Sequence, residues 1–471
     1  MTSLFWFRQD LRLSDNPGLT EAAKAGDVIP VYILEDEDAG PDKMGAASRV
    51  FLHHALDSLN KSLGGKLVFL NGPAEICLTQ LISATGAQAI YWNRCYEPWR
   101  IKRDTELKSS LTAGGIAVQS FQANLLWEPM QIKKGDGTPY KVFTPFYRRG
   151  CLTADAPRLP LPVPSLSIPE TSNHGVKLES LNLRPKHKWG QDIMSGWDAS
   201  ERGAQNALYE FCANGIDDYQ DGRNFPAKRA VSRLSPHLHF GTISPHQAWH
   251  EAGSNRPEDD KNLDIFRSEL GWREFSHSLL FFNPALKQNN LNKKFDSFPW
   301  HTDDARLLAW QTGQTGYPIV DAGMRELYAT GYMHNRVRMI VGSFLVKNLL
   351  LDWRYGEAWF WDCLFDADHA NNSASWQWIA GCGADAAPYF RVFNPVTQGE
   401  KFDKQGDYTR RFVPELAKLP DKYLYAPWTA PKDVLDAANL TLGKTYPHPI
   451  VDVKDSRIAA LEAFATLPKA S

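Results

Sequence analysis

Short runs of β-branched and aromatic residues alternate with amphipathic segments over the first part of the chain. The runs predict strands at residues 4–7, 28–34, 66–70, 89–92 and 117–121. The amphipathic segments predict helices near residues 18–25, 48–63, 74–84 and 101–113. Strands that alternate with helices in this way predict an α/β domain with a doubly wound parallel sheet and helices on both faces.

The expected ligand positions in such a sheet are the carboxyl ends of its strands. Here these ends are residues 8–10, 35–43 and 93–100. No GxGxxG motif follows the first predicted strand, so an ordinary dinucleotide site is not expected there.

The remainder of the chain has a different pattern. Residues 152–187 are rich in proline and have little periodicity, which predicts a long connector because proline blocks helix formation. Helical periodicity then dominates, for example at residues 203–213, 263–282, 319–330 and 336–352. We therefore expect an α/β domain over residues 1–128, an interdomain connector over 129–196 and an all-α domain over 197–471.

Composition excludes several classes of protein. The net charge of −2 means that nucleic-acid binding would need a local basic patch. The six cysteines form no CxxC pair and no Cys/His metal spacing, so we expect no metal, no disulfide frame and a reducing compartment. The sequence opens on a predicted strand without a signal-peptide pattern, and no apolar run is long enough to span a membrane. These features predict a cytoplasmic protein.

Residues 366–395 carry the densest set of candidate site residues. Asp366, Asp368, Asn372, Trp376 and Trp378 lie within thirteen residues in apolar surroundings. A buried carboxylate needs a partner because an unpaired interior charge is costly. A cofactor with hydroxyl groups and ring nitrogens is one such partner.

This segment resembles the flavin-binding core of the DNA photolyase/cryptochrome family. Five other motifs carry the same resemblance in the family's order: FWFRQDLRLSDN (5–16), SRLSPHLHFGTISP (232–245), ELGWREF (269–275), TGYPIVDAGMREL (315–327) and HNRVRM (334–339). The resemblance implies an antenna-binding α/β domain and a helical FAD-binding domain. It also implies light-driven repair of cyclobutane pyrimidine dimers, in which excited reduced FAD donates an electron to a flipped-out dimer in ultraviolet-damaged DNA.

The resemblance also implies a set of FAD-binding residues. These are Tyr219, Val231, Ser232, Arg233, Leu234, Ser235, Phe266, Arg273, Arg338, Asp366, Asp368 and Asn372. Residues 232–235 match a phosphate-gripping segment, although Val231 stands where threonine is usual. Arg338 and Asp366 match an ion pair beside the flavin ring, and Asp368 matches a contact on the ribityl or adenine side. Asn372 matches the residue facing flavin N5, where an amide favours repair over signalling.

Other matched positions concern the lesion and the DNA. The implied catalytic residues are Glu269, Trp272, Asn335, Met339 and Trp378, and the implied DNA-binding residues are Arg223, Arg273, Arg336 and Arg391. The two tryptophans match rings that clasp the dimer, since aromatic faces hold an extruded base by stacking. The (6-4) photoproduct enzymes carry histidines where this chain has Asn335 and Met339, so that activity is disfavoured.

Tryptophans are concentrated in the helical part: nine of the 16 fall between Trp249 and Trp378. Trp300, Trp353 and Trp376 match the family's electron relay, and Trp359 and Trp361 are candidates for a branch. Simple packing remains the alternative role for each ring.

The implied second chromophore has a less specific signal. Its candidate residues are Glu35, Lys43, Trp99 and Arg100. We expect 5,10-methenyltetrahydrofolate stacked near Trp99. The alternative is 8-hydroxy-5-deazaflavin, because Arg100 replaces the glutamate that grips folate in well-known members.

The sequence that flanks the core motif resembles that of a bacterial class of photolyases close to plant cryptochromes. A light-sensing cryptochrome is the main alternative, and it usually bears a C-terminal extension, whereas this chain ends soon after the matched core. We expect damaged DNA as the partner, no obligate protein partner and a monomeric protein.

Overall fold

The computed structural model describes residues 1–170, 174–386 and 391–468. The chain divides into two compact units. The N-terminal unit comprises residues 1–216, 232–284 and 365–370, and the C-terminal unit comprises 217–231, 285–364 and 371–471. The domain boundaries predicted from the sequence remain a prediction.

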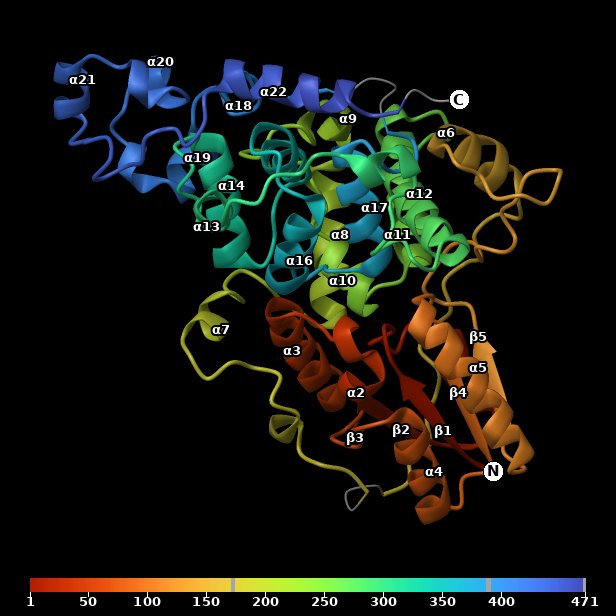
Figure 1. Cartoon of the computed structure of the whole chain (residues 1–471). Helices are drawn as coiled ribbons and strands as arrows, with labels where there is room; N and C mark the ends of the chain where they lie inside the picture. Colours follow the sequence, from red (N-terminus) through yellow and green to blue (C-terminus); the bar gives the residue numbers. More distant parts are fainter. Residues whose placement is uncertain (171–173, 387–390, 469–471) are drawn as a thin grey trace. The chain divides into compact units, whose positions relative to one another are not determined.

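A five-stranded parallel sheet forms the centre of the N-terminal unit (Figure 1). Its strands are β1 (Thr2–Phe7), β2 (Asp27–Leu34), β3 (Val68–Asn71), β4 (Ala89–Asn93) and β5 (Ala117–Phe121). They pair in the order β3-β2-β1-β4-β5, and every pair is parallel. The predicted α/β fold is confirmed. The winding direction reverses between β1 and β4, the point where such sheets bind ligands.

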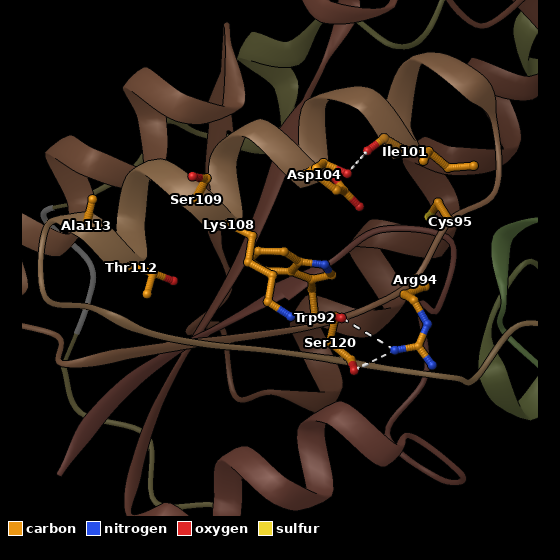
Figure 2. A pocket seen from close by; sticks show the side chains of 11 residues that line it. Trp92, Arg94, Cys95, Ile101, Asp104, Lys108, Ser109, Thr112, Ala113 and Ser120 are labelled. Carbon is orange, nitrogen blue, oxygen red and sulfur yellow. Dashed lines mark hydrogen bonds between the residues drawn. The ribbon is translucent and has the colours of Figure 1, made fainter.

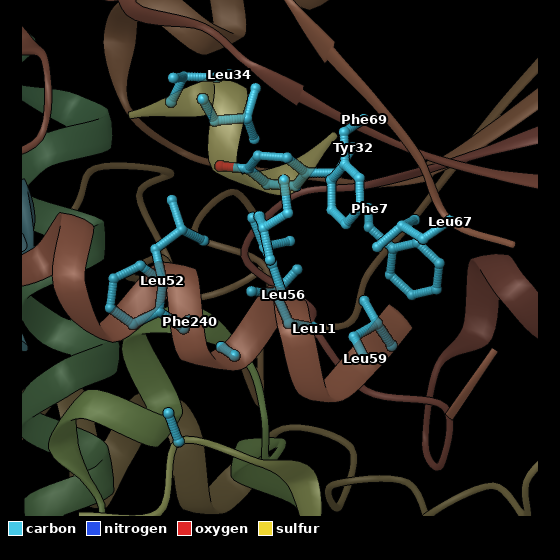
Figure 3. Packing of buried hydrophobic residues seen from close by; sticks show 14 of the residues in the cluster. Phe7, Leu11, Tyr32, Leu34, Leu52, Leu56, Leu59, Leu67, Phe69 and Phe240 are labelled. Carbon is cyan, nitrogen blue, oxygen red and sulfur yellow. The ribbon is translucent and has the colours of Figure 1, made fainter. Parts of the chain in front are cut away.

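Alternate side chains of the strands enter two separate cores, as the two-residue period of a strand requires. Phe5 and Phe7 of β1 pack with helices α1 (Pro17–Ala25) and α3 (Ala46–Ser62). Figure 3 shows Phe7 of this core with Leu52, Leu56 and Leu59 of α3. Leu4 and Trp6 instead pack with α4 (Ala74–Thr85) and α5 (Pro98–Ala113). Helices therefore cover both faces of the sheet.

Helices form most of the rest of the N-terminal unit. The longer ones are α8 (Glu201–Asn214), α10 (Ser235–Phe240), α11 (Pro245–Gly253) and α12 (Lys261–Phe282), and the shorter ones are α2 (Asp36–Ala39), α6 (Phe143–Pro145) and α7 (Trp189–Asp192). Their starts carry polar caps. Asp260 accepts the N–H groups of Asn262 and Leu263 at the start of α12, and Ser244 forms a capping box at α11.

The described residues of the C-terminal unit form helices joined by loops and contain no strand of a sheet. Its helices are α9 (Tyr219–Gly222), α13 (Asp304–Gln311), α14 (Pro318–Thr330), α15 (Asn335–Ser343), α16 (Trp353–Cys363), α17 (His369–Ala380), α18 (Pro395–Phe402), α19 (Asp407–Phe412), α20 (Asp421–Leu424), α21 (Lys432–Ala437) and α22 (Val453–Ala465). The first two residues of α17 belong to the N-terminal unit.

The helix predicted over residues 336–352 is wrong at its end. Helix α15 stops at Ser343 and continues only as a π-helical segment, Phe344–Asn348. Leu350 then adopts a left-handed conformation with φ of 54°. Asp352 accepts the N–H of Arg354 at 3.0 Å and caps the next helix, α16. The cap stabilises a new helix start, which hydrophobic periodicity alone does not reveal.

Candidate functional site

Asp368 lies in a buried polar cluster of the N-terminal unit. Its Oδ2 is 3.9 Å from Nδ1 of His239 on α10 and 3.6 Å from Nε2 of His277 on α12. All three side chains are at least nine-tenths buried. Burial lowers the pKa of both histidines, and the Asp368 carboxylate acts in the opposite direction. The cluster brings together segments that lie far apart in the sequence.

The predicted phosphate segment begins just before α10. The Ser232 hydroxyl accepts the N–H of Leu234 at 3.4 Å. Arg233 adopts a left-handed φ of 53°, and its guanidinium carbon lies 4.2 Å from the centre of the Trp197 ring. Ser235 is the first residue of α10. The two remaining predicted residues, Val231 and Tyr219, belong to the C-terminal unit, where the Arg223 guanidinium lies over the Tyr219 ring.

Helix α12 positions four predicted residues. Phe266, Glu269 and Arg273 follow one another at spacings of three and four, so they share one face of the helix. Trp272 stacks on Phe143 of α6, with ring centres 3.8 Å apart and planes inclined by 11°. The stacked phenylalanine fixes the plane of the half-buried indole.

A second set of predicted residues lies on α17 in the C-terminal unit. The Asn372 amide donates to the Glu357 carbonyl at 3.0 Å, which leaves Oδ1 as its acceptor. One helical turn later, Trp376 contacts Phe360 and Trp310 edge-to-face, with ring centres 5.0 and 6.2 Å apart. Gly356 packs against the same indole, because a Cβ there would overlap the ring.

The other two predicted relay rings differ in environment. Trp353 is fully buried, and its Nε1–H donates to Asn290 Oδ1 at 3.0 Å. The Arg354 guanidinium lies 4.6 Å from its ring centre. Trp300 is half-buried beside Phe298, with ring centres 4.3 Å apart. All three relay residues belong to the C-terminal unit.

The predicted rim residues fall near the start of α15. Arg336 lies over the Phe402 ring at 4.5 Å and hydrogen-bonds to Asn224 Oδ1. Its Nη1 is 3.8 Å from Met339 Sδ. Burial and the neighbouring Arg223 lower the pKa of Arg336. Asn335 is exposed.

Three further predicted residues form hydrogen bonds within the C-terminal unit. Arg338 donates from Nε to the Met333 carbonyl at 2.8 Å. The Trp378 Nε1–H donates to the Asp385 carbonyl at 3.1 Å. Arg391 is exposed, and its carbonyl accepts from Lys347 Nζ at 2.6 Å. Residues 387–390 of the core motif lie outside the described residues.

Three of the four candidate antenna residues meet at the carboxyl ends of the strands. Glu35 pairs with Arg100 at 3.6 Å and also with Arg103. The two guanidinium groups lie 4.8 and 5.4 Å from the centre of the Trp99 ring. Lys43 is exposed. The structure therefore brings together Glu35, Trp99 and Arg100.

Several residues of this strand-end cluster were not among the candidate antenna residues, although Arg8 and Glu97 lie at strand ends where a ligand was expected. Arg8 lies over the Trp6 ring at 4.9 Å and pairs with Asp104 at 2.6 Å, while Glu97 pairs with Arg100 at 3.0 Å. A sequence signal existed, because positions 97, 100, 103 and 104 share one face of α5. The buried atoms Trp6 Nε1, Trp99 Nε1, Arg100 Nε and Glu97 Oε2 form no hydrogen bond within the described chain. Such atoms fit a polar ligand.

Figure 2 shows a groove of about 680 Å³ in the N-terminal unit, between α5 and strands β4 and β5, and Asp104 of the strand-end cluster is one of its lining residues. Trp92, Lys108 and Ser120 contribute to its lining. Arg94 donates to the Ser120 carbonyl at 2.7 Å and pairs with Glu128 at 2.6 Å. No predicted antenna residue lines this groove.

Two features are absent from residues 1–170, 174–386 and 391–468. No helix there combines the length and apolar character needed to cross a bilayer. No group of three or more His, Cys, Asp or Glu side chains in these ranges is arranged to hold a metal ion.

Sequence comparison matches residues 3–165 to the family described as DNA photolyase and residues 266–466 to the FAD-binding domain of DNA photolyase. The chain is 50% identical to a deoxyribodipyrimidine photo-lyase of Agrobacterium fabrum, over 99% of this chain and 98% of that protein. It is 37% identical to cryptochrome-1 of Arabidopsis thaliana, over 99% of this chain and 70% of that protein. A class III photolyase structure from Agrobacterium tumefaciens superposes with a TM-score of 0.94 at 49% identity, covering 98% of this chain and 97% of that one.

Proposed function

Because the chain belongs to the DNA photolyase/cryptochrome family, we propose that it uses blue light to repair cyclobutane pyrimidine dimers in DNA. Similarity to a deoxyribodipyrimidine photo-lyase along nearly the whole chain is the observation that supports this most strongly. The similarity to a cryptochrome is lower. Asn335 and Met339 in place of histidines favour the cyclobutane dimer over the (6-4) photoproduct.

FAD is the resident cofactor of this family domain. The donor and acceptor types on each unit fit it. In the N-terminal unit, the Asp366 and Asp368 carboxylates suit N–H and hydroxyl donors, and the Ser232 and Ser235 hydroxyls suit phosphate. In the C-terminal unit, Asn372 Oδ1 suits an N–H donor because its amide nitrogen is already bound to the Glu357 carbonyl. When bound and reduced, FAD supplies the light-excited electron that splits the dimer.

The lesion-binding role falls to Glu269, Trp272 and Trp378. Stacking of an extruded base on an aromatic ring contributes about 1–3 kcal/mol. Trp272 is prepared for this role because Phe143 already stacks on one of its faces. Glu269, three residues earlier on α12, hydrogen-bonds the pyrimidine edge. Asn335 and Met339 are the other two residues proposed to contact the lesion.

The relay role falls to Trp376, Trp353 and Trp300, which carry an electron inward to oxidised FAD. Two observations support it. Trp376 has aromatic neighbours within 5.0 and 6.2 Å, and Trp300 is the partly exposed member of the set. The relay prepares the reduced cofactor and does not contact the lesion.

DNA contacts fall to Arg223, Arg273, Arg336 and Arg391. Guanidinium groups bind phosphate by charge-assisted hydrogen bonds and read the backbone without sequence preference. We expect the protein to act on DNA as a monomer.

The strand-end cluster is the proposed site of a second chromophore. Trp99 and the buried unpaired Trp6 Nε1, Trp99 Nε1 and Glu97 Oε2 atoms support a polar aromatic ligand. We favour 5,10-methenyltetrahydrofolate, with 8-hydroxy-5-deazaflavin as the alternative because the cluster holds three arginines. Reconstitution with each compound, followed by absorbance spectroscopy, tests this. A near-ultraviolet band gained only with the folate supports it, and retention of the deazaflavin alone, or of neither, contradicts it.

Light-dependent repair of dimer-containing DNA by the purified, FAD-loaded protein tests the main proposal. We expect dimers to disappear under blue light and to persist in the dark. Glu269→Gln is the matched variant, since it keeps the shape of the side chain and removes its charge. A wild-type protein that binds FAD and is photoreduced, yet repairs neither dimers nor (6-4) photoproducts, would instead support a cryptochrome.

A further inference from the structure

The segment around α6 carries an uneven charge. Residues 131–150 contain one acidic residue, Asp136, in a chain whose net charge is −2. The basic residues of the same segment are Lys133, Lys134, Lys141, Arg148 and Arg149. All of these charged side chains are exposed. A local excess of this kind is what nucleic-acid binding needs in a protein without a global positive field.

Two of these cations are offset by neighbouring acids. Arg148 Nη1 lies 2.7 Å from Asp264 Oδ1 on α12. Asp136 has a lowered pKa because Thr138 donates to it from its hydroxyl and its backbone N–H, and the Lys134 cation acts in the same direction. The charges of Arg148 and Lys134 are therefore partly compensated inside the protein.

The three remaining cations form no ion pair with a described residue: Lys133, Lys141 and Arg149. The fold brings them together at Gly150. A Cβ there would lie 2.7 Å from Ile132 Cγ2 and 3.0 Å from Tyr140 Cε2. Ile132, Tyr140 and Gly150 each adjoin one of the three cations in the chain. The three cations therefore form one basic patch.

Aromatic contacts connect the basic patch to the proposed lesion ring. Phe143, two residues after Lys141, stacks on Trp272 of α12 with ring centres 3.8 Å apart. The Tyr147 ring is parallel to that of Phe143 at 5.6 Å and packs against Gly271, the residue before Trp272. Figure 1 shows α6 beside α12. The patch is thus held in the same unit as Trp272, on a segment that contacts this ring directly.

The DNA contacts proposed above are distributed unevenly between the units. Three of the four arginines belong to the C-terminal unit. The fourth, Arg273, is mostly buried and pairs with Glu274 at 3.3 Å. Duplex DNA carries about one charge per 1.7 Å of its axis, so a base extruded onto Trp272 brings flanking phosphates to the N-terminal unit. Exposed cations without a carboxylate partner suit these phosphates.

We propose that Lys133, Lys141 and Arg149 bind the phosphates of the duplex that flanks the lesion. This inference rests on the proposed function, because Trp272 is assigned to the lesion there. It adds a DNA-binding surface in the N-terminal unit that the sequence motifs do not mark. Phosphate contacts act on any base sequence, so the patch contributes to binding and not to the light-driven step.

Binding of the FAD-loaded protein to dimer-containing duplex DNA at a series of salt concentrations tests the proposal. Replacing all three cations by alanine should reduce the magnitude of the slope of log affinity against log salt by about 0.9 per contact, about 2.7 in all. Lys141→Arg keeps the charge and should keep the wild-type slope. Lys102→Ala is the matched control, because Lys102 is an exposed lysine of α5 that forms no ion pair with a described residue. Its slope should equal that of the wild type.

Repair of a dinucleotide that contains the dimer provides a second measurement, because this substrate has no flanking duplex. The wild type and the triple variant should repair it equally well, whereas on duplex DNA the variant should show a raised KM and an unchanged maximal rate. Equal salt slopes for the wild type and the triple variant, or slower dinucleotide repair by the variant, overturn the inference and leave the proposed function intact. Absence of repair of both substrates by the wild type overturns the proposed function, and the salt slope for duplex DNA still reports on the patch.

Discussion

Arginines stack on aromatic rings in both units, but their charges are compensated differently. In the strand-end cluster, Arg8 lies over Trp6 and is paired with Asp104 at 2.6 Å. In the C-terminal unit, Arg336 lies over Phe402, and its side-chain partners within the described residues are the neutral Asn224 and Met339. We infer that Arg8, which has a carboxylate partner, stabilises the fold, and we propose that the part-buried Arg336, which has none among the described residues, binds an external anion.

The pKa values of the two arginines separate in the same way. Burial acts against the charge of both groups. For Arg8, the nearby Asp104, Cys95 and Glu35 outweigh burial, and its pKa is raised. For Arg336, the neighbouring Arg223 adds to burial, and its pKa is lowered. The presence or absence of nearby acidic groups, not burial, therefore sets the direction in which each arginine pKa shifts. This difference can be tested.

Removal of Arg8 should have the largest effect. Arg8→Ala removes a fully buried guanidinium that pairs with the part-buried Asp104 and donates to the Asn93 carbonyl, and Asp104 keeps only Arg103 at 2.8 Å, so the free energy of unfolding should fall by about 3–5 kcal/mol. Urea unfolding followed by circular dichroism measures this. Lys61→Ala is the control, because Lys61 forms an exposed pair with Asp57 on α3 and should cost less than about 1 kcal/mol. Equal losses in both variants would contradict the assigned role of Arg8.

Glu274 is an intermediate case in which the nearby arginine does not offset burial. It accepts the N–H groups of Leu126 and Trp127 at 2.9 and 3.2 Å and pairs with Arg273 at 3.3 Å. Burial nevertheless raises its pKa from 4.5 to about 7. Between these values the folded state binds the proton and the unfolded state does not, so stability falls as the pH rises through this window and is level above it.

The expected loss from pH 4.5 to 7 is about 3 kcal/mol, the free energy that corresponds to a shift of this size. Glu274→Gln should remove this part of the pH dependence. Unfolding curves for the wild type and the variant across this range, subtracted at each pH, measure the contribution. A difference that does not change with pH would show that Glu274 stays charged in the folded protein.

The sequence predicted the sheet well because the signal there is local. Four of the five strands are short, mainly apolar runs bounded by a turn or a helix, and all five were found within two residues at each end. The set of Asn372, Trp376 and Trp378 was also local, since the three lie on one helix. The end of α15 was missed because it depends on the left-handed Leu350 and the Asp352 cap.

The contacts that the sequence did not reveal join distant segments. His277 meets Asp368 across 91 positions, and Arg8 meets Asp104 across 96. Arg8 follows β1 at a strand end where a ligand was expected, but no local pattern indicates the distant partner of either Arg8 or His277. Such pairs become visible only when tertiary packing brings the segments together.

Trp353 adds a third arginine to the comparison, because the guanidinium over its ring also has a carboxylate partner. Arg354 lies over the indole and pairs with Asp352 at 3.0 Å. The nearby carboxylate offsets a charge that would otherwise oppose oxidation of the ring. Trp353→Phe should therefore slow photoreduction of bound FAD at least about tenfold, a barrier change of about 1.4 kcal/mol, and leave repair by pre-reduced protein near normal.

Flash photolysis measures this rate. Trp92→Phe is the control, since Trp92 is a buried tryptophan of β4 in the other unit, and its loss should not change photoreduction. Wild-type photoreduction in Trp353→Phe would make Trp353 a packing residue.

Removal of Arg336 should have the smallest effect and tests the comparison most directly. Without a carboxylate partner among the described residues, Arg336 is available to DNA phosphate. Arg336→Ala should leave the unfolding free energy within about 1 kcal/mol of the wild type, and it should lower the slope of log affinity against log salt for dimer-containing DNA by about one. Arg306→Ala is the control in the same unit, because Arg306 is paired with Asp303 at 3.4 Å, and its slope should match the wild type. If the two variants bind DNA with the same salt dependence, an uncompensated guanidinium does not mark a DNA contact in this protein.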